Sequence, residues 1–403
     1  MLVGAVVVLV LAAVAVPSAI ALLRDDDAPK PRRHASRGAD ARNPHPVAGH
    51  FRPDGTRLEE CPAKGARCYE QAFGNLAYTK GPRTALAAFD RMLQTEPAVE
   101  AGCHRIAHTI GSASLARLQG NVGEAFVQGS SSCWSGYYHG ILERAFNDVS
   151  SESELVQVAR GVCDDGDIRS TAFLAYQCVH GLGHGLMIYS GYNVPFSLGV
   201  CDRLASKWDA TSCTGGVFME NISSTYGVRS KWLRDDDLVY PCNAMKERHK
   251  LYCYLMVTSR VNEANGYDWR ETASVCASVE KGWVRTCFES FGRDASGFTR
   301  QNPREVARLC SLAGRHAGSC YYGAARDMTS NYANGVRAGK LCRLAPATLR
   351  ERCFYGIGTI VGTLARAESG RRRACADVTP RALLASCLEG AQVRIRGVVQ
   401  APS

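Results

Sequence analysis

The stretch of residues 303–323 reads PREVARLCSLAGRHAGSCYYG and contains the complete unit from which most of this chain is built. A helix-forming segment begins at Pro303, carries apolar residues at helical spacing and runs into Cys310. A polar loop follows, and Cys320 opens a second helix-like segment with glycine at the third position after the cysteine. The stretch therefore predicts a helical hairpin whose two helices are joined by a disulfide.

The same unit recurs along the chain at intervals of 33 to 40 residues, counted by its second cysteine at Cys178, Cys213, Cys253, Cys287, Cys320, Cys353 and Cys387. A period of this length is typical of stacked helical hairpins. We therefore expect an all-α fold, a solenoid of about eight disulfide-linked helical hairpins with a period of about 34 residues. This repeat domain is predicted to cover residues 59–392.

All 18 cysteines can be placed in neighbouring pairs. The repeat spacing pairs Cys163 with Cys178, Cys201 with Cys213, Cys242 with Cys253, Cys276 with Cys287, Cys310 with Cys320, Cys342 with Cys353 and Cys375 with Cys387. Cys61 with Cys68 follows the same rule with a shorter loop, and Cys103 with Cys133 is the pair that remains. The alternative is a set of metal-thiolate sites, but the Cys-x-x-Cys spacing favoured by zinc is absent. Disulfides are the better interpretation.

Glycine stands at the third position after the second cysteine in most repeats, as Gly136, Gly181, Gly216, Gly323, Gly356 and Gly390, whereas Met256 and Ser290 break the rule. A residue without a side chain at a repeated helical position lets two helices approach closely. We expect these glycines to lie at contacts between neighbouring repeats.

The N-terminal segment suggests export. Residues 1–23 carry no charge and are long enough, as a helix of about 35 Å, to span a bilayer. We interpret them as a membrane anchor, or as a signal peptide if they are cleaved, in which case the protein is secreted. Residues 24–58 read as a disordered linker and residues 393–403 as a tail. The paired cysteines predict an oxidising, extracytoplasmic compartment.

The repeat unit resembles the cysteine-rich relatives of tetratricopeptide repeats. The residues that carry this resemblance are the helix–Cys–loop–Cys–helix rhythm and the segment Thr84 to Leu93 followed by Glu96 and Pro97, which is similar to the second helix of such a repeat. The resemblance implies a right-handed superhelix with a concave binding groove. It implies no catalytic residues.

The histidines are unevenly distributed. Three pairs with i, i+4 spacing fall within 81 residues: His104 with His108, His139 with Glu143, and His180 with His184. On a helix this spacing places both side chains on one face, where two imidazoles, or an imidazole and a carboxylate, can bind one metal ion. His139 and His184 each follow their cysteine by six residues, so stacked helices should present them side by side.

This pattern predicts a mononuclear or dinuclear transition-metal site, with Zn, Fe or Cu as the ion, because imidazole suits these metals better than calcium or magnesium. Two other interpretations remain open: a groove of aromatic and histidine residues for an organic ligand or peptide, and purely structural histidines. No sequence motif of a serine hydrolase, phosphate-binding loop or dinucleotide site is present. If the protein is an enzyme, we therefore expect a metal-dependent hydrolase or oxygenase.

Downstream repeats change the residue at the sixth position after the cysteine to Ser259, Arg293, Arg326 and Thr359. The arginines can form ion pairs within and between repeats, or they can line a cationic wall for an anionic ligand. The net charge is +10, and aromatic residues are sparse in the basic C-terminal part, which argues against nucleic acid. The expected partners are the membrane, through the N-terminal helix, and a peptide or an anionic envelope component.

Overall fold

The structure, a computed structural model, describes residues 51–393 except residues 148, 150 and 225–228. The predicted anchor at 1–23, most of the linker and nearly all of the tail lie outside the described residues. Within the described part of the chain every regular element is a helix and no strand is present. The prediction of an all-α fold is confirmed.

The elements of the first half are η1 (Leu58–Glu60), α1 (Ala66–Lys80), α2 (Pro82–Met92), α3 (Pro97–Ala101), α4 (Cys103–Arg117), α5 (Val122–Val127), α6 (Ser132–Ala145), α7 (Glu152–Gly161), η2 (Ile168–Ser170), α8 (Ala172–Tyr189), α9 (Val194–Cys201) and α10 (Lys207–Ile222). The second half contains η3 (Cys242–Ala244), α11 (Glu247–Ala264), α12 (Trp269–Ser278), α13 (Val284–Phe298), α14 (Pro303–Ser311), η4 (Gly314–His316), α15 (Ala317–Tyr332), α16 (Val336–Leu344), η5 (Ala347–Leu349), α17 (Arg350–Leu364), α18 (Glu368–Val378), η6 (Arg381–Leu383) and α19 (Leu384–Gly390).

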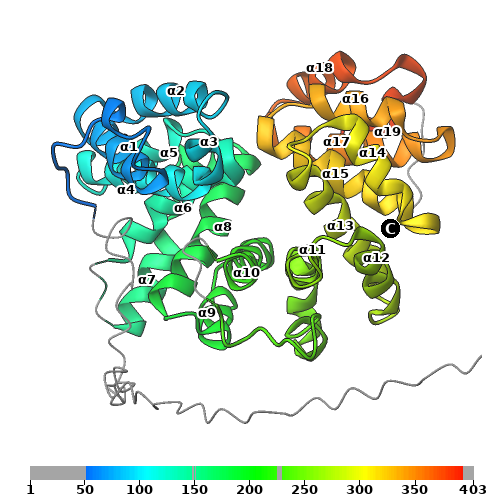
Figure 1. Ribbon diagram of the computed structural model, residues 1–403, viewed down its shortest axis with the longest axis horizontal. Helices are drawn as coiled ribbons and strands as arrows, with labels where there is room; N and C mark the ends of the chain where they lie inside the picture. Colours follow the sequence, from blue (N-terminus) through cyan, green and yellow to red (C-terminus); the bar gives the residue numbers. More distant parts are fainter. Residues whose placement is uncertain (1–50, 148, 150, 225–228, 394–403) are drawn as a thin grey trace, which may run out of the picture. The chain divides into compact units, whose positions relative to one another are not determined.

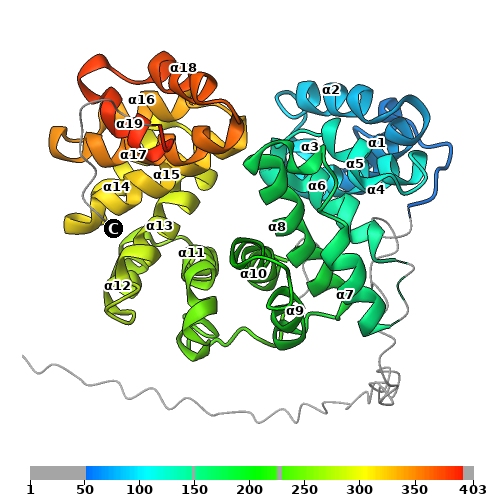
Figure 2. The ribbon, with the colours of Figure 1, turned by 180° about the vertical axis from the view of Figure 1, so that it is seen from behind.

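The helices form repeats, as the spacing of the cysteines predicts. From α6 onward the helix that contains the second cysteine of each unit packs against its counterpart in the next unit, in the order α6, α8, α10, α11, α13, α15, α17 and α19, and α4, which carries Cys103, packs against α6. Figure 1 shows this succession from cyan to red, and Figure 2 shows the same neighbours from behind. Distant repeats are also in contact, since α15 touches α6 and α17 touches α8.

Nine disulfides join the cysteines in the predicted pairs: Cys61–Cys68, Cys103–Cys133, Cys163–Cys178, Cys201–Cys213, Cys242–Cys253, Cys276–Cys287, Cys310–Cys320, Cys342–Cys353 and Cys375–Cys387. In the repeats from Cys163 onward, each bond spans 10 to 15 residues, and all but Cys242–Cys253 tie the end of one helix to the next helix. In the chain-entropy model a loop of this size contributes about 3 kcal/mol of stability.

The glycines after the second cysteine lie at close contacts between repeats. A Cβ atom on Gly216 of α10 would lie 1.9 Å from the carbonyl oxygen of His180 on α8, and one on Gly323 of α15 would lie 1.9 Å from the carbonyl oxygen of Glu289 on α13. Only glycine fits at these two positions with the helices as close as they are. The neighbouring helix offers a second glycine in return, since a Cβ on Gly183 would lie 2.1 Å from the carbonyl oxygen of Cys213.

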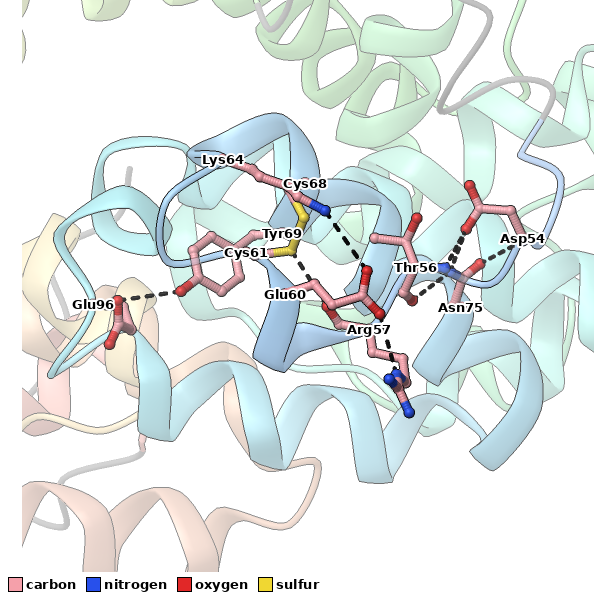
Figure 3. The surroundings of a disulfide bond; sticks show 10 residues. All are labelled: Asp54, Thr56, Arg57, Glu60, Cys61, Lys64, Cys68, Tyr69, Asn75 and Glu96. Atoms are coloured by element: carbon pink, nitrogen blue, oxygen red, sulfur yellow. Dashed lines mark hydrogen bonds and ion pairs between the residues drawn. A yellow bond between two sulfur atoms is a disulfide. The ribbon is translucent and has the colours of Figure 1, made fainter.

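The folded part of the chain begins earlier than the sequence predicts. Residues 51–58 were expected to belong to the linker, but Phe51 is buried and its ring lies against Gly74 of α1. The Asn75 side chain on the same helix donates to the Asp54 carboxylate at 2.8 Å, close to the Cys61–Cys68 disulfide (Figure 3). One aromatic side chain and one amide thus attach this segment to α1, where composition alone suggested a solvated tether.

No helix of the described residues combines the length and the hydropathy needed to cross a membrane. The segment that the sequence assigns to the membrane, residues 1–23, is not among them.

Candidate metal centre

The five predicted histidines come together from three consecutive helices. His104 and His108 lie on α4, His139 on α6, and His180 and His184 on α8. Four of them are buried, with at most 3% of their surface exposed, and His104 is partly buried. The helices approach closely at α4 and α6, since a Cβ on Gly140 would lie 1.9 Å from the carbonyl oxygen of His108.

The ring nitrogens form two groups of three that could each hold a metal ion, His104 with His108 and His139, and His139 with His180 and His184. Within each group the ligand atoms lie within 4.8 Å of one another, and His139 belongs to both. The rings of His139 and His184 are stacked with centroids 4.0 Å apart, as expected from their common repeat position. The arrangement can hold one ion or two adjacent ions that share His139.

Hydrogen bonds on the outer side of the cluster set the protonation of three rings. The Nδ1 atom of His104 lies 2.8 Å from the carbonyl oxygen of Cys133, that of His108 lies 3.2 Å from Glu143 Oε2, and that of His184 lies 2.8 Å from Glu220 Oε2. A carbonyl or a carboxylate only accepts, so each Nδ1 must donate. In the neutral ring this leaves the lone pair on Nε2, the arrangement of most metal-binding histidines.

The Nε2 atoms of His180 and His184 face each other at 3.3 Å. Because His184 donates through Nδ1 to Glu220, its Nε2 carries a lone pair directed toward the other ring. The Nδ1 atom of His180 lies 3.2 Å from the hydroxyl of Tyr176. A metal ion between the two rings would accept a lone pair from both.

His139 stands at the centre of the cluster with no hydrogen bond. It is 1% exposed, and among the described residues neither ring nitrogen has a hydrogen-bond partner. A buried polar group without a partner costs about 1 to 3 kcal/mol. A metal bond to one nitrogen would remove part of that cost.

The environment of four of the five rings favours their neutral form. Burial lowers the pKa of His104, and it lowers the pKa of His139 and His184 well below the usual value, where the neighbouring histidines add to the effect. Burial also lowers the pKa of His180 to about 3. Neutral imidazole is the form that binds a metal, so the cluster is prepared for one at neutral pH.

The two carboxylates of the site lie behind the rings. Glu143 was predicted as a metal ligand, but its carboxylate contacts Nδ1 of His108 and it belongs to neither group of ligand atoms. The carboxylate oxygen instead faces the His108 ring from α6 across to α4. Glu220 of α10 has the same function toward His184 and accepts a second hydrogen bond, at 2.9 Å, from the Tyr192 hydroxyl.

Sequence reasoning missed Glu220. It lies seven residues after Cys213, directly after Met219, in a repeat without histidine. The only signal was its place on the helix after α8, one residue beyond the repeat position of His139 and His184.

The start of α6 has an unusual backbone. Cys133, Trp134 and Ser135 all have positive φ, at 50°, 53° and 63°. Left-handed conformations are costly for residues other than glycine and often occur at functional sites. Here the turn places the Cys133 carbonyl oxygen on His104 and leaves Trp134 43% exposed.

The histidine cluster borders a cavity of about 360 Å³. His139 and His180 line it on one side, together with Met219, whereas residues of α13, α15 and α17 line the other side. Five lining residues occupy the same repeat position, the sixth after the second cysteine: His139, Met219, Arg293, Arg326 and Thr359. This register therefore forms the inner surface of the repeats.

The two downstream arginines of the cavity differ in their partners, and the predicted cationic wall for an anionic ligand stays a prediction. Arg293 forms an ion pair with Asp294, as the interpretation of these arginines as ion-pairing residues predicts. Arg326 forms no ion pair with any described carboxylate, and its guanidinium carbon lies 5.4 Å from the Tyr322 ring centroid. The carboxylate of Glu289, which also lines the cavity, is paired with Arg352 at 3.0 Å.

Comparison of the chain with protein-family models, with curated proteins and with solved structures found no match. The site is therefore interpreted from its own geometry.

Proposed function

We propose that this protein binds a transition-metal ion, Zn, Fe or Cu, through the imidazoles of His104, His108, His139, His180 and His184. The observation that carries the proposal is the orientation of the rings. Three of them donate through Nδ1 to a fixed acceptor on the outside, while the five rings supply two groups of three close ligand atoms that share His139. Structural histidines need no such shared orientation.

The function we infer is metal-dependent catalysis on a small molecule, as a hydrolase or an oxygenase. The ion would adjoin the cavity at His139 and His180, and a cavity of about 360 Å³ has the size of a small-molecule site. Such an ion can act as a Lewis acid, activate bound water or bind dioxygen. Tyr176 contacts His180 and also lines the cavity, so it is positioned to orient that ring and to contact a substrate.

We also propose that the protein acts outside the cytoplasm as an exported helical solenoid related to tetratricopeptide repeats. The nine disulfides support an oxidising compartment. Attachment to the membrane through residues 1–23 is part of the same proposal and is supported by the sequence of that segment.

A second candidate is a binding module without catalysis, for a peptide or an envelope component. The observation that favours it is the lining of the cavity by Trp134 and Trp208, which are 43% and 44% exposed. Exposed tryptophans are enriched at binding surfaces. In that case the metal would be structural, and its removal would leave ligand affinity unchanged.

Metal analysis of the purified extracytoplasmic part, kept free of chelators, tests the main proposal. We expect a stoichiometric Zn, Fe or Cu content that is lost in the double variant His139→Ala with His184→Ala. The matched control is His316→Ala, because His316 stacks on Phe288 outside the cluster. Absence of a bound transition metal from the unmodified protein, or its retention in the double variant, would refute the proposal.

A further inference from the structure

The cavity beside the histidine cluster contains two side chains of opposite charge that are adjacent in sequence. Arg326 and Asp327, both on α15, line it. Neither forms an ion pair with another described residue. Their atoms Arg326 Nε and Asp327 Oδ2 are buried and have no hydrogen-bond partner in the described part of the chain.

The other charged residues of the cavity differ from these two. Arg293 is held by Asp294 and by the Ser259 hydroxyl at 2.6 Å, and Glu289 is held by Arg352. These contacts neutralise their charges within the protein. One cation and one carboxylate at the cavity surface thus remain to be matched by a ligand.

Burial of unmatched charges is expensive, and the titration of Asp327 reflects it. Burial raises the pKa of the Asp327 carboxyl to about 6, although the nearby Ser296 hydroxyl and the Arg293 guanidinium oppose the shift. The Asp327 and Arg326 side chains are both half-buried. The exposed surface of both side chains contributes to the cavity lining. An oppositely charged group inside the cavity would stabilise each of them.

Aromatic side chains form a large part of the remaining lining. Phe173 and Tyr176 of α8, Trp208 of α10, Tyr252 of α11 and Trp134 of α6 all contribute. The ring centroids of Tyr176 and Trp208 are 6.4 Å apart, in an edge-to-face arrangement. Such a surface suits a flat apolar group.

We propose that the cavity binds a small zwitterion with an aromatic body, of the class of aromatic α-amino acids. The carboxylate of the ligand pairs with Arg326 and its ammonium with Asp327. The ring lies among the aromatic side chains, on the side of His139 and His180. This inference deepens the proposed function. Only one part of it, the position of the ligand's ring relative to a metal ion, rests on that proposed function.

Calorimetric titration of the unmodified, metal-loaded protein tests the charge requirement without any mutation. The probes are L-phenylalanine, 3-phenylpropanoate, which lacks the ammonium, and 2-phenylethylamine, which lacks the carboxylate. We expect L-phenylalanine to bind at least about tenfold more tightly than either analogue, because each analogue leaves one buried charge unmatched. Equal affinity for the three probes, or no measurable binding of L-phenylalanine, would overturn the inference.

Two variants assign the charges to residues. Arg326→Gln should remove the preference over 2-phenylethylamine, and Asp327→Asn should remove the preference over 3-phenylpropanoate. The controls are Arg308→Gln and Asp377→Asn, which change exposed residues of α14 and α18 and should leave all affinities unchanged. Unchanged selectivity in Arg326→Gln would contradict the assignment.

The metal proposal and the ligand inference fail separately. In His139→Ala with His184→Ala, the preference for L-phenylalanine over both analogues should persist even though the metal is lost. Metal binding without this preference would refute the ligand inference alone, and the preference without metal binding would refute the metal site alone.

Discussion

The helices α6 and α8 of the first half and α13 and α15 of the second half share a scaffold and differ in the chemistry at one repeat position. The sixth residue after the second cysteine is His139 and His184 in the first pair, and Arg293 and Arg326 in the second. The first two rings stack at 4.0 Å. Both arginines line the cavity, but of the two only Arg293 is paired with a described carboxylate, that of Asp294.

The comparison shows which residues determine the packing and which determine the function. Gly216 and Gly323 occupy the same repeat position, and a Cβ atom on either would lie 1.9 Å from a carbonyl oxygen of the preceding helix, that of His180 or that of Glu289. Cysteine and glycine thus fix the spacing of the helices. The residues of the inner register can vary on that scaffold.

The largest expected effect is on the glycine contacts. Gly216→Ala and Gly323→Ala should each destabilise the protein by about 3 kcal/mol, since the new methyl group overlaps a backbone oxygen and the helices must separate. Urea unfolding measures both. Only Gly216→Ala should also weaken metal binding, because its contact is with the backbone of His180. Equal metal affinity in the two variants would show that the packing of α8 against α10 does not affect the metal site.

Acidification should destabilise the metal-free protein because the buried histidines of its first half are neutral when folded. A histidine whose folded pKa is lowered binds protons more readily when unfolded, so stability falls as the pH drops below the unfolded value of about 6.5. For His180, with a folded pKa of about 3, the loss between pH 7 and pH 5 is about 2 kcal/mol.

Urea unfolding of the chelator-treated protein at the two pH values measures this loss. His180→Gln should reduce it by about 2 kcal/mol. A pH dependence that is the same in the variant and in the unmodified protein would show that His180 is not buried as a neutral ring.

The carboxylates behind the rings should affect metal affinity more than stability. Glu220→Gln removes the charge that orients His184 and should weaken metal binding roughly 10- to 100-fold, as changes to groups that hydrogen-bond a metal-binding histidine commonly do. Competition with a metal-binding dye measures the change. The matched control is Glu124→Gln, since Glu124 is an exposed residue of α5, and an equal effect in both variants would contradict the orienting function.

The smallest effect is expected at Thr359, the last of the cavity-lining residues at the sixth position after the second cysteine. Thr359 donates to the carbonyl oxygen of Gly356 at 2.8 Å within its own helix. Thr359→Val should change stability by less than about 1 kcal/mol and leave the metal content unchanged. Loss of metal in this variant would mean that the site extends further along the register than the histidines.

Much of the scaffold could be predicted from the sequence, because its determinants are periodic. The pairing of Cys310 with Cys320 follows from local spacing, and the close approach at Gly323 follows from the recurrence of glycine at one position. The convergence of His139 and His184 was also predictable, since equivalent positions in stacked helices lie side by side. These features depend on neighbours in sequence and on one repeat length.

The rest depends on contacts that no local pattern encodes. Glu220 reaches His184 from the next repeat, and Glu143 points to the preceding helix, so their functions follow from the packing of four helices, α4, α6, α8 and α10. The cavity depends on the contacts of α15 with α6 and of α17 with α8, which join residues far apart in the chain. Phe51 is a single aromatic residue in a polar segment, and composition could not identify its burial.

The most direct test of the central claim is anomalous diffraction at the absorption edge of the bound metal, from crystals of protein never exposed to a chelator. The account predicts an anomalous peak with the Nε2 atoms of His184 and His180 at about 2.0 to 2.2 Å, the length of a metal–imidazole bond. A map without a peak among the five rings, with the metal bound elsewhere or absent, would contradict it.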